Sequence, residues 1–284
     1  GGDRLVIQGN NFGPISDKIS VNYGPSNAPF QYLAENCYVT QVDVEIQCTT
    51  ARGVNGGHAV TVTVGSQKSK LSTVTISYGA PIISGILPDI ETGVELFKLQ
   101  TRGGEKIIIN GSNFPSQIGE AKIVVTYGSS NGDRFFAKDC VILSPGTSMA
   151  CLTTEGSGSG HNWYITVGNM PAANYFADAT AYDKPEITSL RGPGVRNANT
   201  RGMEVMFIHG HNFFGKEINM TYGPTAAEYV ATDCEIFVRH EIVRCLSDEG
   251  TGHKHLFRIT IDSLSSVLYT GEYGYGQPVL NDVA

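Results

Sequence analysis

Apolar and polar residues alternate in short stretches along the whole chain, and clusters of turn-forming residues separate these stretches. Residues 19–23 (ISVNY) alternate in this way, and so do residues 123–127 and 218–222. A period of two residues is typical of a β-strand that has one buried face. No segment of useful length shows the period of a helix. The pattern therefore predicts an all-β protein.

Four markers recur three times in the same order. They are a Gly-x-Asn-Phe phrase, a Tyr-Gly pair that closes an alternating strand, two cysteines with ten residues between them, and a Tyr-x-x-Pro phrase. The Gly-x-Asn-Phe phrase lies at Gly9–Phe12, Gly111–Phe114 and Gly210–Phe213, and the Tyr of the Tyr-Gly pair is Tyr23, Tyr127 or Tyr222. The cysteine pairs are Cys37/Cys48, Cys140/Cys151 and Cys234/Cys245, and the Tyr-x-x-Pro phrase lies at Tyr78–Pro81, Tyr182–Pro185 and Tyr275–Pro278. Repetition of this kind indicates a tandem array of similar units.

The Tyr-x-x-Pro phrase divides the chain into three repeats. Repeat 1 covers residues 1–80 and lacks a leading Pro-containing strand, repeat 2 covers residues 81–184, and repeat 3 covers residues 185–277. Residues 278–284 are the start of a further repeat or a linker. Short strands over about a hundred residues per copy indicate a sandwich of roughly seven strands. The predicted fold is therefore all-β, with three tandem immunoglobulin-like β-sandwiches in a rod.

Composition and charge argue against several classes of function. The formal net charge is −7 and the pI is near 5.5, and no basic stripe is visible, so a nucleic-acid partner is not expected. No apolar run approaches the roughly 18 residues of a membrane helix, so no direct membrane insertion is expected. The apolar content of 40% is sufficient to build buried cores.

The ordered set of markers resembles the IPT/TIG domain, an immunoglobulin-like domain of plexins, hepatocyte-growth-factor-receptor-type receptors and fibrocystin-type proteins. The Gly-Gly element of that family stands here at Gly1-Gly2 and Gly103-Gly104 and is reduced to Arg201-Gly202-Met203 in the third copy. The resemblance implies an immunoglobulin-like fold and a tendency to form extracellular stalks and binding surfaces. DNA-contacting members of the Rel type lack this regular cysteine pair, and the acidic balance of this chain also argues against that branch.

The three equivalent cysteine pairs predict one disulfide in each repeat, Cys37–Cys48, Cys140–Cys151 and Cys234–Cys245. If each pair spans a β-hairpin, the two cysteines lie directly opposite each other and the tip lies midway between them. Free structural thiols are one alternative. Zinc is another, but it would need four ligands and each repeat supplies two cysteines without a CxxC. Disulfides predict an extracellular or cell-surface location, which includes the surface of a flagellum or cilium.

No group of residues predicts catalysis, and neither an enzyme nor a cofactor is expected. The loop Gly156–His161 lacks the ending of a P-loop and the spacing of a nucleophile elbow. Asp248 and Glu249 are adjacent, so they point apart in an extended segment. A calcium site between repeats would need several oxygen ligands that converge. Three acidic residues lie near the junctions but form no recognised motif, namely Asp89, Glu91 and Asp183.

One histidine per copy follows the Gly-rich turn, at His58, His161 and His253, and the recurrence favours a hydrogen bond that supports the turn. Repeat 3 is richer in histidine, and we expect His253 and His255 to share a strand face. The other histidines of that repeat are His209, His211 and His240. Without a third ligand of known proximity, no metal site is predicted.

Two Asn-x-Ser/Thr sequons make Asn110 and Asn219 candidates for glycosylation, and Asn219 should face outward on its strand. An apolar position before the Val/Ile-x-Val/Ile strand is predicted to pack in the core of each repeat, at Val60, Trp163 and Phe257. A second set is predicted to face outward and to pack against a loop, a neighbouring repeat or another chain, namely Val6, Ile108 and Phe207.

The Pro-containing junctions leave almost no spacer between repeats, which predicts stiff connections. The leading hypothesis is a non-catalytic extracellular structural or adhesive segment, in a cell-surface stalk or a flagellar-hair (mastigoneme-type) filament, that binds copies of itself or other extracellular chains. One alternative is a receptor ectodomain that binds a protein ligand, favoured by the insert 117–120 and the tract 171–181 of repeat 2. The other is an accessory module of a secreted carbohydrate-active enzyme.

Overall fold

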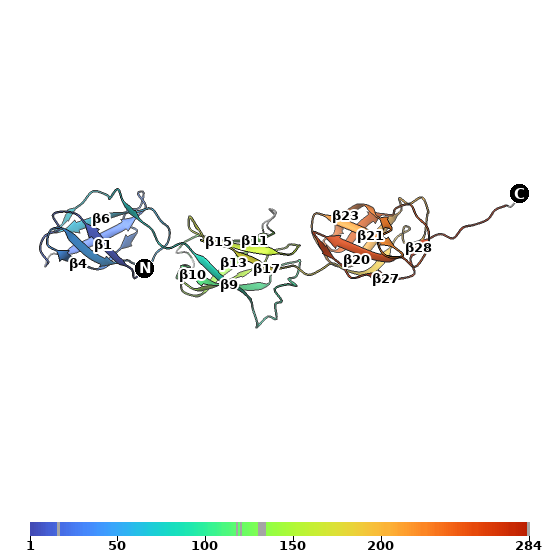
Figure 1. The fold of residues 1–284 in the computed structure, drawn as a ribbon, viewed down its shortest axis with the longest axis horizontal. Helices are drawn as coiled ribbons and strands as arrows, with labels where there is room; N and C mark the ends of the chain where they lie inside the picture. Colours follow the sequence, from blue (N-terminus) through green and yellow to red (C-terminus); the bar gives the residue numbers. More distant parts are fainter. Residues whose placement is uncertain (16–17, 118, 120, 130–134, 283–284) are drawn as a thin grey trace.

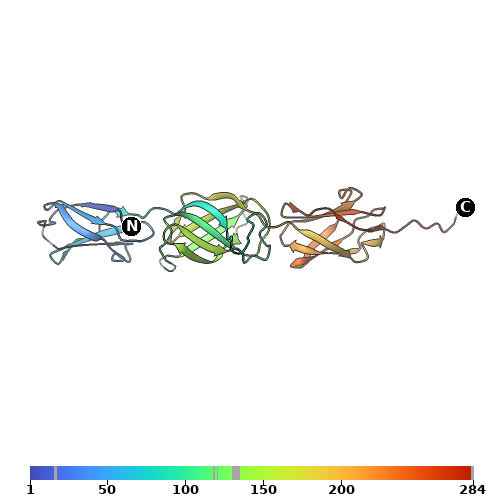
Figure 2. The same ribbon diagram turned by 90° about the horizontal axis from the view of Figure 1, so that it is seen from below.

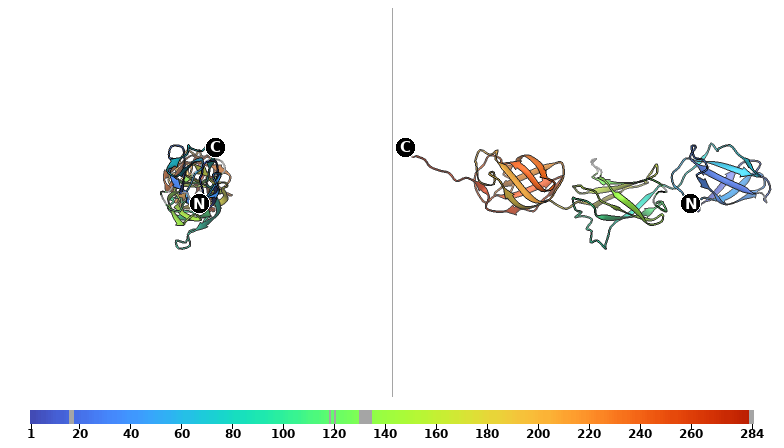
Figure 3. Two further views of the ribbon diagram at one scale, coloured as in Figure 1. Left: turned by 90° about the vertical axis from the view of Figure 1, so that its left-hand side faces the viewer. Right: turned by 180° about the vertical axis from the view of Figure 1, so that it is seen from behind.

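The chain is built from strands and turns throughout the part that the structure describes. The computed structural model describes residues 1–15, 18–117, 119, 121–129 and 135–282, and no helix occurs among them. Figures 1 and 2 show the sheets gathered into three bodies that follow one another along a rod. Seen along its length the molecule is narrow (Figure 3). The prediction of an all-β, immunoglobulin-like fold is confirmed.

Repeat 1 consists of a three-stranded and a five-stranded sheet packed face to face. Its three-stranded sheet has the order β1-β5-β4, with β1 at Arg4–Gln8, β5 at Glu45–Thr49 and β4 at Glu35–Gln41. The second sheet contains β2 (Ile19–Gly24), β3 (Tyr32–Leu33), β6 (His58–Val64), β7 (Gln67–Lys68) and β8 (Thr75–Ile76). The strand pairings in both sheets are antiparallel.

Repeat 2 has the same arrangement with one strand more. Its first sheet has the order β13-β14-β10-β9, with β13 at Lys138–Ser144, β14 at Ser148–Leu152, β10 at Lys106–Ser112 and β9 at Ile82–Pro88. The second sheet contains β11 (Ile123–Gly128), β12 (Phe135–Phe136), β15 (His161–Val167), β16 (Met170–Pro171) and β17 (Phe176–Thr180). The additional strand β9 lies beside β10, which corresponds to β1 of repeat 1.

Repeat 3 also has a four-stranded first sheet. Its order is β18-β20-β24-β23, with β18 at Glu186–Arg191, β20 at Val205–Phe213, β24 at His240–Leu246 and β23 at Thr232–Val238. The second sheet contains β21 (Ile218–Gly223), β22 (Tyr229–Val230), β25 (Leu256–Ile261), β26 (Leu264–Ser265) and β27 (Tyr269–Thr270). A short parallel pair, β19 (Arg196–Ala198) and β28 (Gly274–Tyr275), completes the repeat.

Each body encloses a hydrophobic core between its two sheets, and the three cores are separate clusters. The position before the Val/Ile-x-Val/Ile strand is buried in every copy, as Val60 at 8%, Trp163 at 0% and Phe257 at 2% exposure. This prediction from the sequence is confirmed. Among the described residues no strand pairing joins one repeat to another. The placing of the boundaries near residues 80, 184 and 277 remains a prediction.

The Asn of the Gly-x-Asn-Phe phrase adopts a left-handed backbone conformation in every repeat. Its φ is 65° at Asn11, 59° at Asn113 and 63° at Asn212. Asparagine tolerates this region better than most residues because its short polar side chain can form local hydrogen bonds. The turn lets the following Phe point into the core, where Phe12, Phe114 and Phe213 are all buried. The backbone conformation of this turn therefore explains why the phrase recurs.

The cysteine pairs form three disulfides, Cys37–Cys48, Cys140–Cys151 and Cys234–Cys245, each with a Cα–Cα distance of 4.1 Å. Each joins the two strands of one hairpin, and the register of that hairpin shifts beside the first cysteine. The residue before that cysteine has a positive φ in every copy, at Asn36, Asp139 and Asp233. A β-bulge at this point places the two cysteines opposite each other without a break in the hairpin.

Candidate functional site: the junctions and outer faces of the repeats

In repeats 2 and 3, an asparagine side chain forms a clasp, a hydrogen bond to the segment that enters the repeat. The amide Nδ2 of Asn113 donates a hydrogen bond to the carbonyl oxygen of Ala80 at 2.9 Å, and Nδ2 of Asn212 donates to the carbonyl oxygen of Lys184 at 2.9 Å. Ala80 and Lys184 both precede the Pro of the junction phrase, so their carbonyl groups are fixed in an extended conformation. The Gly-x-Asn-Phe turn therefore holds the incoming chain as well as closing its own strand.

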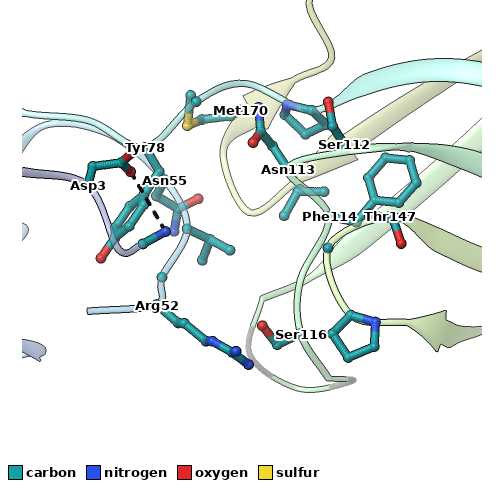
Figure 4. A pocket seen from close by; sticks show the side chains of 18 residues that line it. Asp3, Arg52, Asn55, Tyr78, Ser112, Asn113, Phe114, Ser116, Thr147 and Met170 are labelled. Carbon is teal, nitrogen blue, oxygen red and sulfur yellow. Dashed lines mark ion pairs between the residues drawn. The ribbon is translucent and has the colours of Figure 1, made fainter. Parts of the chain in front are cut away.

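The first junction encloses a cavity of about 430 Å³ between repeats 1 and 2. Figure 4 shows Arg52 and Asn55 on the side of repeat 1, with Asn113, Phe114 and Thr147 facing them from repeat 2. Across the junction, Asn55 Oδ1 accepts a hydrogen bond from the backbone N–H of Asn169 at 3.0 Å. Val54 of repeat 1 is buried and belongs to the hydrophobic cluster of repeat 2. Val54 therefore packs the end of repeat 1 against the core of repeat 2.

The second junction contains ion pairs as well as hydrogen bonds. Glu155 of repeat 2 contacts Arg239 Nη1 at 2.8 Å and His240 Nε2 at 2.8 Å, and both partners lie at the hairpin tip of repeat 3. The other ring nitrogen of His240 lies 2.9 Å from Thr101 Oγ1, and Arg102 pairs with Glu241 at 2.8 Å. These contacts connect the hairpin tip of one repeat to the end of the previous one.

The corresponding positions at the first junction cannot form these pairs. Arg52 takes the place of Glu155, four residues after the second cysteine, and Pro145 takes the place of Arg239, five residues after the first cysteine. An arginine thus faces a proline at one junction, and a glutamate faces an arginine at the other. Ion pairs between repeats therefore stabilise the second junction, and the first junction lacks them among the described residues.

A histidine packed among aromatic rings caps the end of each sandwich. The ring of His161 lies 5.8 Å from that of Tyr127, 5.8 Å from that of Phe135 and 5.3 Å from that of Tyr182. The hydroxyl oxygens of Tyr127 and Tyr182 are 2.6 Å apart, and both contact the carbonyl oxygen of Thr154. Equivalent hydroxyl pairs, 2.7 Å apart in each case, are Tyr23 with Tyr78 and Tyr222 with Tyr275. In each repeat, the tyrosine of the Tyr-Gly pair and the tyrosine of the Tyr-x-x-Pro phrase are therefore hydrogen-bonded to each other.

The imidazole of His161 is held in its neutral form. Nε2 lies 3.1 Å from the carbonyl oxygen of Ser157, which can only accept, so Nε2 carries the proton. Nδ1 then accepts from the Thr180 hydroxyl at 3.3 Å, and this hydroxyl accepts from Trp163 Nε1 at 3.0 Å. Burial lowers the pKa of His161 to about 4, against the opposing effect of the hydrogen bond to Ser157. Protonation of Nδ1 would require the Thr180 hydroxyl to turn its proton away and to accept a second hydrogen bond.

We expect acid to destabilise repeat 2 well before its carboxylates titrate. The folded-state pKa of His161 is about 4 and the unfolded value is near 6.5. The stabilisation is therefore complete above about pH 6.5 and is lost as the pH falls toward 4, by up to the order of 3 kcal/mol. Trp163 is the only tryptophan of the chain and lies in repeat 2, so its fluorescence during urea unfolding reports this repeat alone.

The matched variant for this experiment is His161→Phe, which keeps an aromatic ring but cannot be protonated. Its free energy of unfolding should change less between pH 6.5 and pH 5 than that of the wild type. Equal pH dependence of the two proteins in this range would contradict the assignment.

The histidine of repeat 3 that matches His58 and His161 is His255, and the expectation that His253 holds this place was wrong. His255 is 1% exposed and contacts the rings of Tyr222, Tyr229 and Tyr275. His253 is exposed. The two histidines do not share a strand face either, because Lys254 between them has a φ of 58° and interrupts the extended backbone. Burial lowers the pKa of His255 as it does that of His161.

The groups considered for catalysis have structural partners instead. Ser157 of the Gly-rich loop donates its hydroxyl to Asp262 of repeat 3, across the second junction. The backbone N–H of Asp248 donates a hydrogen bond to the Tyr222 hydroxyl oxygen at 2.8 Å, and the backbone N–H of Glu249 donates to Oδ1 of Asp248 at 2.9 Å. The loop 156–160 therefore serves as a connector between repeats.

The acidic residues near the junctions do not gather into a cation site. Asp89 is 4% exposed and pairs with Lys106 at 3.1 Å, while Asp183 accepts a hydrogen bond from the backbone of Lys184 at 2.8 Å. Glu91 donates its backbone N–H to Asp89. Across the part of the chain that the structure describes, no three His, Cys, Asp or Glu side chains converge as metal ligands. His209, His211 and His240 are likewise not brought together with His253 and His255.

The two sequons lie in different surroundings. Asn219 is exposed on β21. Asn110 lies on the central strand β10 between β9 and β14, is half-buried, and its Oδ1 accepts a hydrogen bond from the Ser148 hydroxyl at 2.9 Å. Glycosylation of either residue remains a prediction. The geometry favours Asn219, since a glycan on Asn110 would displace a hydrogen bond within the sheet.

Apolar side chains gather on the outer face of the first sheet of each repeat. In repeat 2, Ile108 lies opposite Leu87 on the neighbouring strand, and Leu87 and Val141 are 45% and 46% exposed. In repeat 3 the ring of Phe207 contacts that of Phe237, with 5.4 Å between centroids. In repeat 1, Val6 is 41% exposed. Of the second apolar set of the sequence, Val6 is exposed, whereas Ile108 and Phe207 are half-buried beside apolar side chains of the same sheet.

Sequence reasoning missed a loop of repeat 2 that projects from the rod. The segment between β9 and β10 stands out from the side of the molecule (Figure 1), and it carries Ile90 at 87% exposure and Phe97 at 65%. The tract 171–181, which favoured the receptor alternative, contains strand β17, and this strand pairs with β15. In the insert 117–120, residues 118 and 120 lie outside the described residues.

The sequence model of the IPT/TIG domain family matches residues 1–78. The chain therefore carries an IPT/TIG domain, as the resemblance of its markers indicated. Repeats 2 and 3 share those markers and the same sandwich architecture. A search of the curated proteins finds no match. The described residues contain no helix long and apolar enough to cross a membrane.

Several solved structures are similar in fold over most of the chain. The extracellular region of plexin A4 is 15% identical over 90% of this chain, with a TM-score of 0.30, and the chain spans 21% of its length. A marsupial T cell receptor is 8% identical over 95% of both chains, with a TM-score of 0.34. The Escherichia coli adhesin FdeC is 9% identical over 95% of this chain and 92% of its own, with a TM-score of 0.29.

Proposed function

We propose that this chain is a non-catalytic segment of an extracellular structural or adhesive rod. The observation that supports it best is the build of the junctions. Each has a Pro-containing connection, an Asn-to-carbonyl clasp and direct contacts between repeats. Three disulfides are consistent with an oxidising compartment, outside the cell or at its surface. A cell-surface stalk and a mastigoneme-type filament are the two forms of such a rod that we consider.

Small-angle X-ray scattering of the purified chain tests the rod directly. We expect an elongated particle at low salt, where the ion pairs of the second junction are least screened. Replacement of Glu155 by Gln removes the carboxylate that contacts Arg239 and His240, so the angle between repeats 2 and 3 should vary more and the mean dimension should fall. Arg52→Gln is the matched control at the first junction, where no ion pair of Arg52 to a described residue occurs, and it should leave the scattering unchanged. A compact or freely jointed particle in the wild type would contradict the proposal.

A second candidate function is recognition of a protein ligand through the projecting loop of repeat 2. Ile90 and Phe97 favour it, because large apolar side chains at such exposure are common at binding surfaces. In that case the double variant Ile90→Ser, Phe97→Ser should lose binding to the ligand-bearing surface while its scattering stays that of the rod. No observation favours the third alternative, an accessory module of a carbohydrate-active enzyme.

A further inference from the structure

A second cavity, here called the second-junction cleft, lies between repeats 2 and 3. Its volume is about 830 Å³, compared with about 430 Å³ for the cavity of the first junction. One wall comes from repeat 2 and contains residues 157–159 of the Gly-rich loop. The opposite wall comes from repeat 3 and contains the segment 214–217 and the turn 262–263. Cavities of several hundred Å³ between domains are a common place for small-ligand sites.

Polar groups occupy positions of this cleft that are glycine at the first junction. Ser159 lies two residues before the capping histidine of repeat 2, where repeat 1 has Gly56. Asp262 directly follows β25, whereas Gly168 directly follows the equivalent strand β15. A hydroxyl and a carboxylate therefore line the second junction where the first has no side chain. The fold by itself does not require either group.

The charges of the cleft do not select an ion. Its lining contains three carboxylates and two cationic side chains, namely Glu155, Glu217, Asp262, Lys216 and Arg239. Glu155 pairs with Arg239, and Asp262 accepts a hydrogen bond from the Ser157 hydroxyl. His161 also lines the cleft, and since burial lowers its pKa to about 4, its ring is neutral at neutral pH. An anion would meet an excess of carboxylates, and two of these carboxylates already have donors.

The remaining groups of the cleft are hydrogen-bonding groups beside aromatic rings. The hydroxyl groups of Ser159 and Ser263 belong to exposed residues on opposite walls. The carboxylate of Glu217 is exposed and forms no ion pair with a described residue. The rings of Phe135 and Phe214 are half-buried and line opposite walls as well. The cleft thus offers donors, acceptors and apolar surface from both repeats.

A pyranose sugar has the complementary chemistry. Its hydroxyl groups donate and accept hydrogen bonds around the edge of the ring, and its C–H groups form apolar faces. Serine hydroxyl groups both donate and accept, and an ionised carboxylate accepts more than one hydroxyl donor. Aromatic rings have a negative face that attracts polarised C–H groups. Hydroxyls, a carboxylate and two aromatic rings in one cleft match a sugar better than an ion.

We propose that the second-junction cleft binds a pyranose unit of a glycan. The hydroxyl groups of the sugar bond to Ser159 of repeat 2 and to Ser263 and Glu217 of repeat 3, and its C–H groups contact the two phenyl rings. This inference rests on the proposed function, because it names the class of ligand to which an extracellular adhesive rod would attach.

A sugar in this position couples binding to the shape of the rod. It contacts both walls, so it binds most tightly to the arrangement of repeats 2 and 3 in which both walls are in place. A ligand shifts a conformational equilibrium toward the state that it binds better. Bound sugar therefore stiffens the second junction in addition to the ion pairs of Glu155.

Saturation-transfer difference NMR on the whole chain tests the binding. The chain is produced in the oxidising compartment of a host that adds no glycans, so that no sugar of its own competes. The probes are the methyl α- and β-pyranosides of glucose, galactose, mannose and N-acetylglucosamine, with inorganic phosphate as an anionic competitor. We expect transfer to at least one pyranoside that phosphate does not displace. No transfer to any of them, or displacement by phosphate, would overturn the inference.

A matched pair of substitutions places the sugar in the cleft. Glu217→Ala should lower the affinity about tenfold or more, the effect of losing one hydrogen bond to a charged group. Glu272→Ala should leave the affinity unchanged, because this exposed glutamate of repeat 3 lies outside the cleft lining. Ser159→Phe should abolish binding, since a ring at this exposed loop position fills the cleft. Equal affinities of the two glutamate variants would contradict the site, and unchanged thermal unfolding shows that each variant is folded.

Two further measurements identify the source of the sugar and its effect on the rod. Binding of released N-glycans indicates a glycoprotein as the source, and binding of unbranched polysaccharide fragments indicates a matrix. Saturating sugar should preserve the maximum dimension of the particle at about 0.5 M salt, where the ion pairs of the junction are screened. Sugar that binds without this effect would contradict a ligand held between two repeats.

The inference and the proposed function can fail separately. An elongated particle that binds no pyranoside refutes the sugar site and leaves the rod in place. A freely jointed particle that binds a pyranoside with the expected loss in Glu217→Ala refutes the rod and leaves the site.

Discussion

Replacing Trp163 with alanine is expected to lower the free energy of unfolding of repeat 2 by about 3–5 kcal/mol, the range for a fully buried large aromatic residue. Trp163 is 0% exposed, and its ring stacks on that of Tyr127 with 4.4 Å between centroids and 10° between planes. Its Nε1 donates to Thr180, so the substitution also leaves that hydroxyl with one partner fewer. A cavity and a disrupted hydrogen-bond chain then add to the lost burial.

The measurement is urea unfolding followed by far-UV circular dichroism, since this variant has no tryptophan fluorescence. Trp163→Phe should lose less, because Phe257 fills the same position in repeat 3 and stacks on Tyr222 in the same way, at 5.3 Å and 9°. Tyr175→Ala is the matched control on the surface of the same sheet, where the ring is 54% exposed, and it should cost about 1 kcal/mol or less. A loss for Trp163→Ala as small as that of the control would refute its place in the core.

Removing the disulfide of repeat 2 by Cys140→Ala with Cys151→Ala is expected to cost about 3 kcal/mol in the chain-entropy description of a short closed loop. The two cysteines are 11 positions apart, and the bond joins the two strands of one hairpin. The paired substitution leaves no free thiol to react. A paired loss at Cys37 and Cys48 in repeat 1 should be similar, because the bridged loop has the same length.

The same bond has a mechanical consequence that a rod would use. Under tension the hairpin between the cysteines is protected from extension, so its 11-residue span adds nothing to the length of an unfolded repeat. Pulling the chain with and without reductant should therefore lengthen each unfolding step by roughly 35 Å on reduction, at ~3.3–3.6 Å per extended residue. Steps of equal length in both conditions would show that the hairpin is not bridged.

Much of the architecture could be predicted before any coordinate. The alternation of residues 19–23 and its two counterparts predicted strands, and the recurring cysteines predicted the hairpins that the three disulfides join. These features depend on neighbouring residues, because a period of two residues and a left-handed Asn before a Phe are local properties of the backbone. The repetition of the markers then extended a local pattern to the whole chain.

The identity of the capping histidine shows where this reasoning failed. His253 and His255 both follow a Gly-rich turn, and distance along the sequence did not distinguish them. The structure places His255 among Tyr222, Tyr229 and Tyr275, which come from three separate parts of the repeat. A residue is selected for such a cluster by contacts between distant segments, and a pattern along one segment contains no information about them.

The sequence by itself determined the class of fold, the number of similar units and the places of the bridging cysteines. Strand periodicity and repetition can be recognised from residues that are close together along the chain. Only the tertiary structure decided what lies between the units. Glu155 contacts Arg239 and His240, which lie 84 and 85 positions away along the chain, because the packing of whole repeats brings distant segments together. The stiffness that we propose for the rod depends on these long-range contacts.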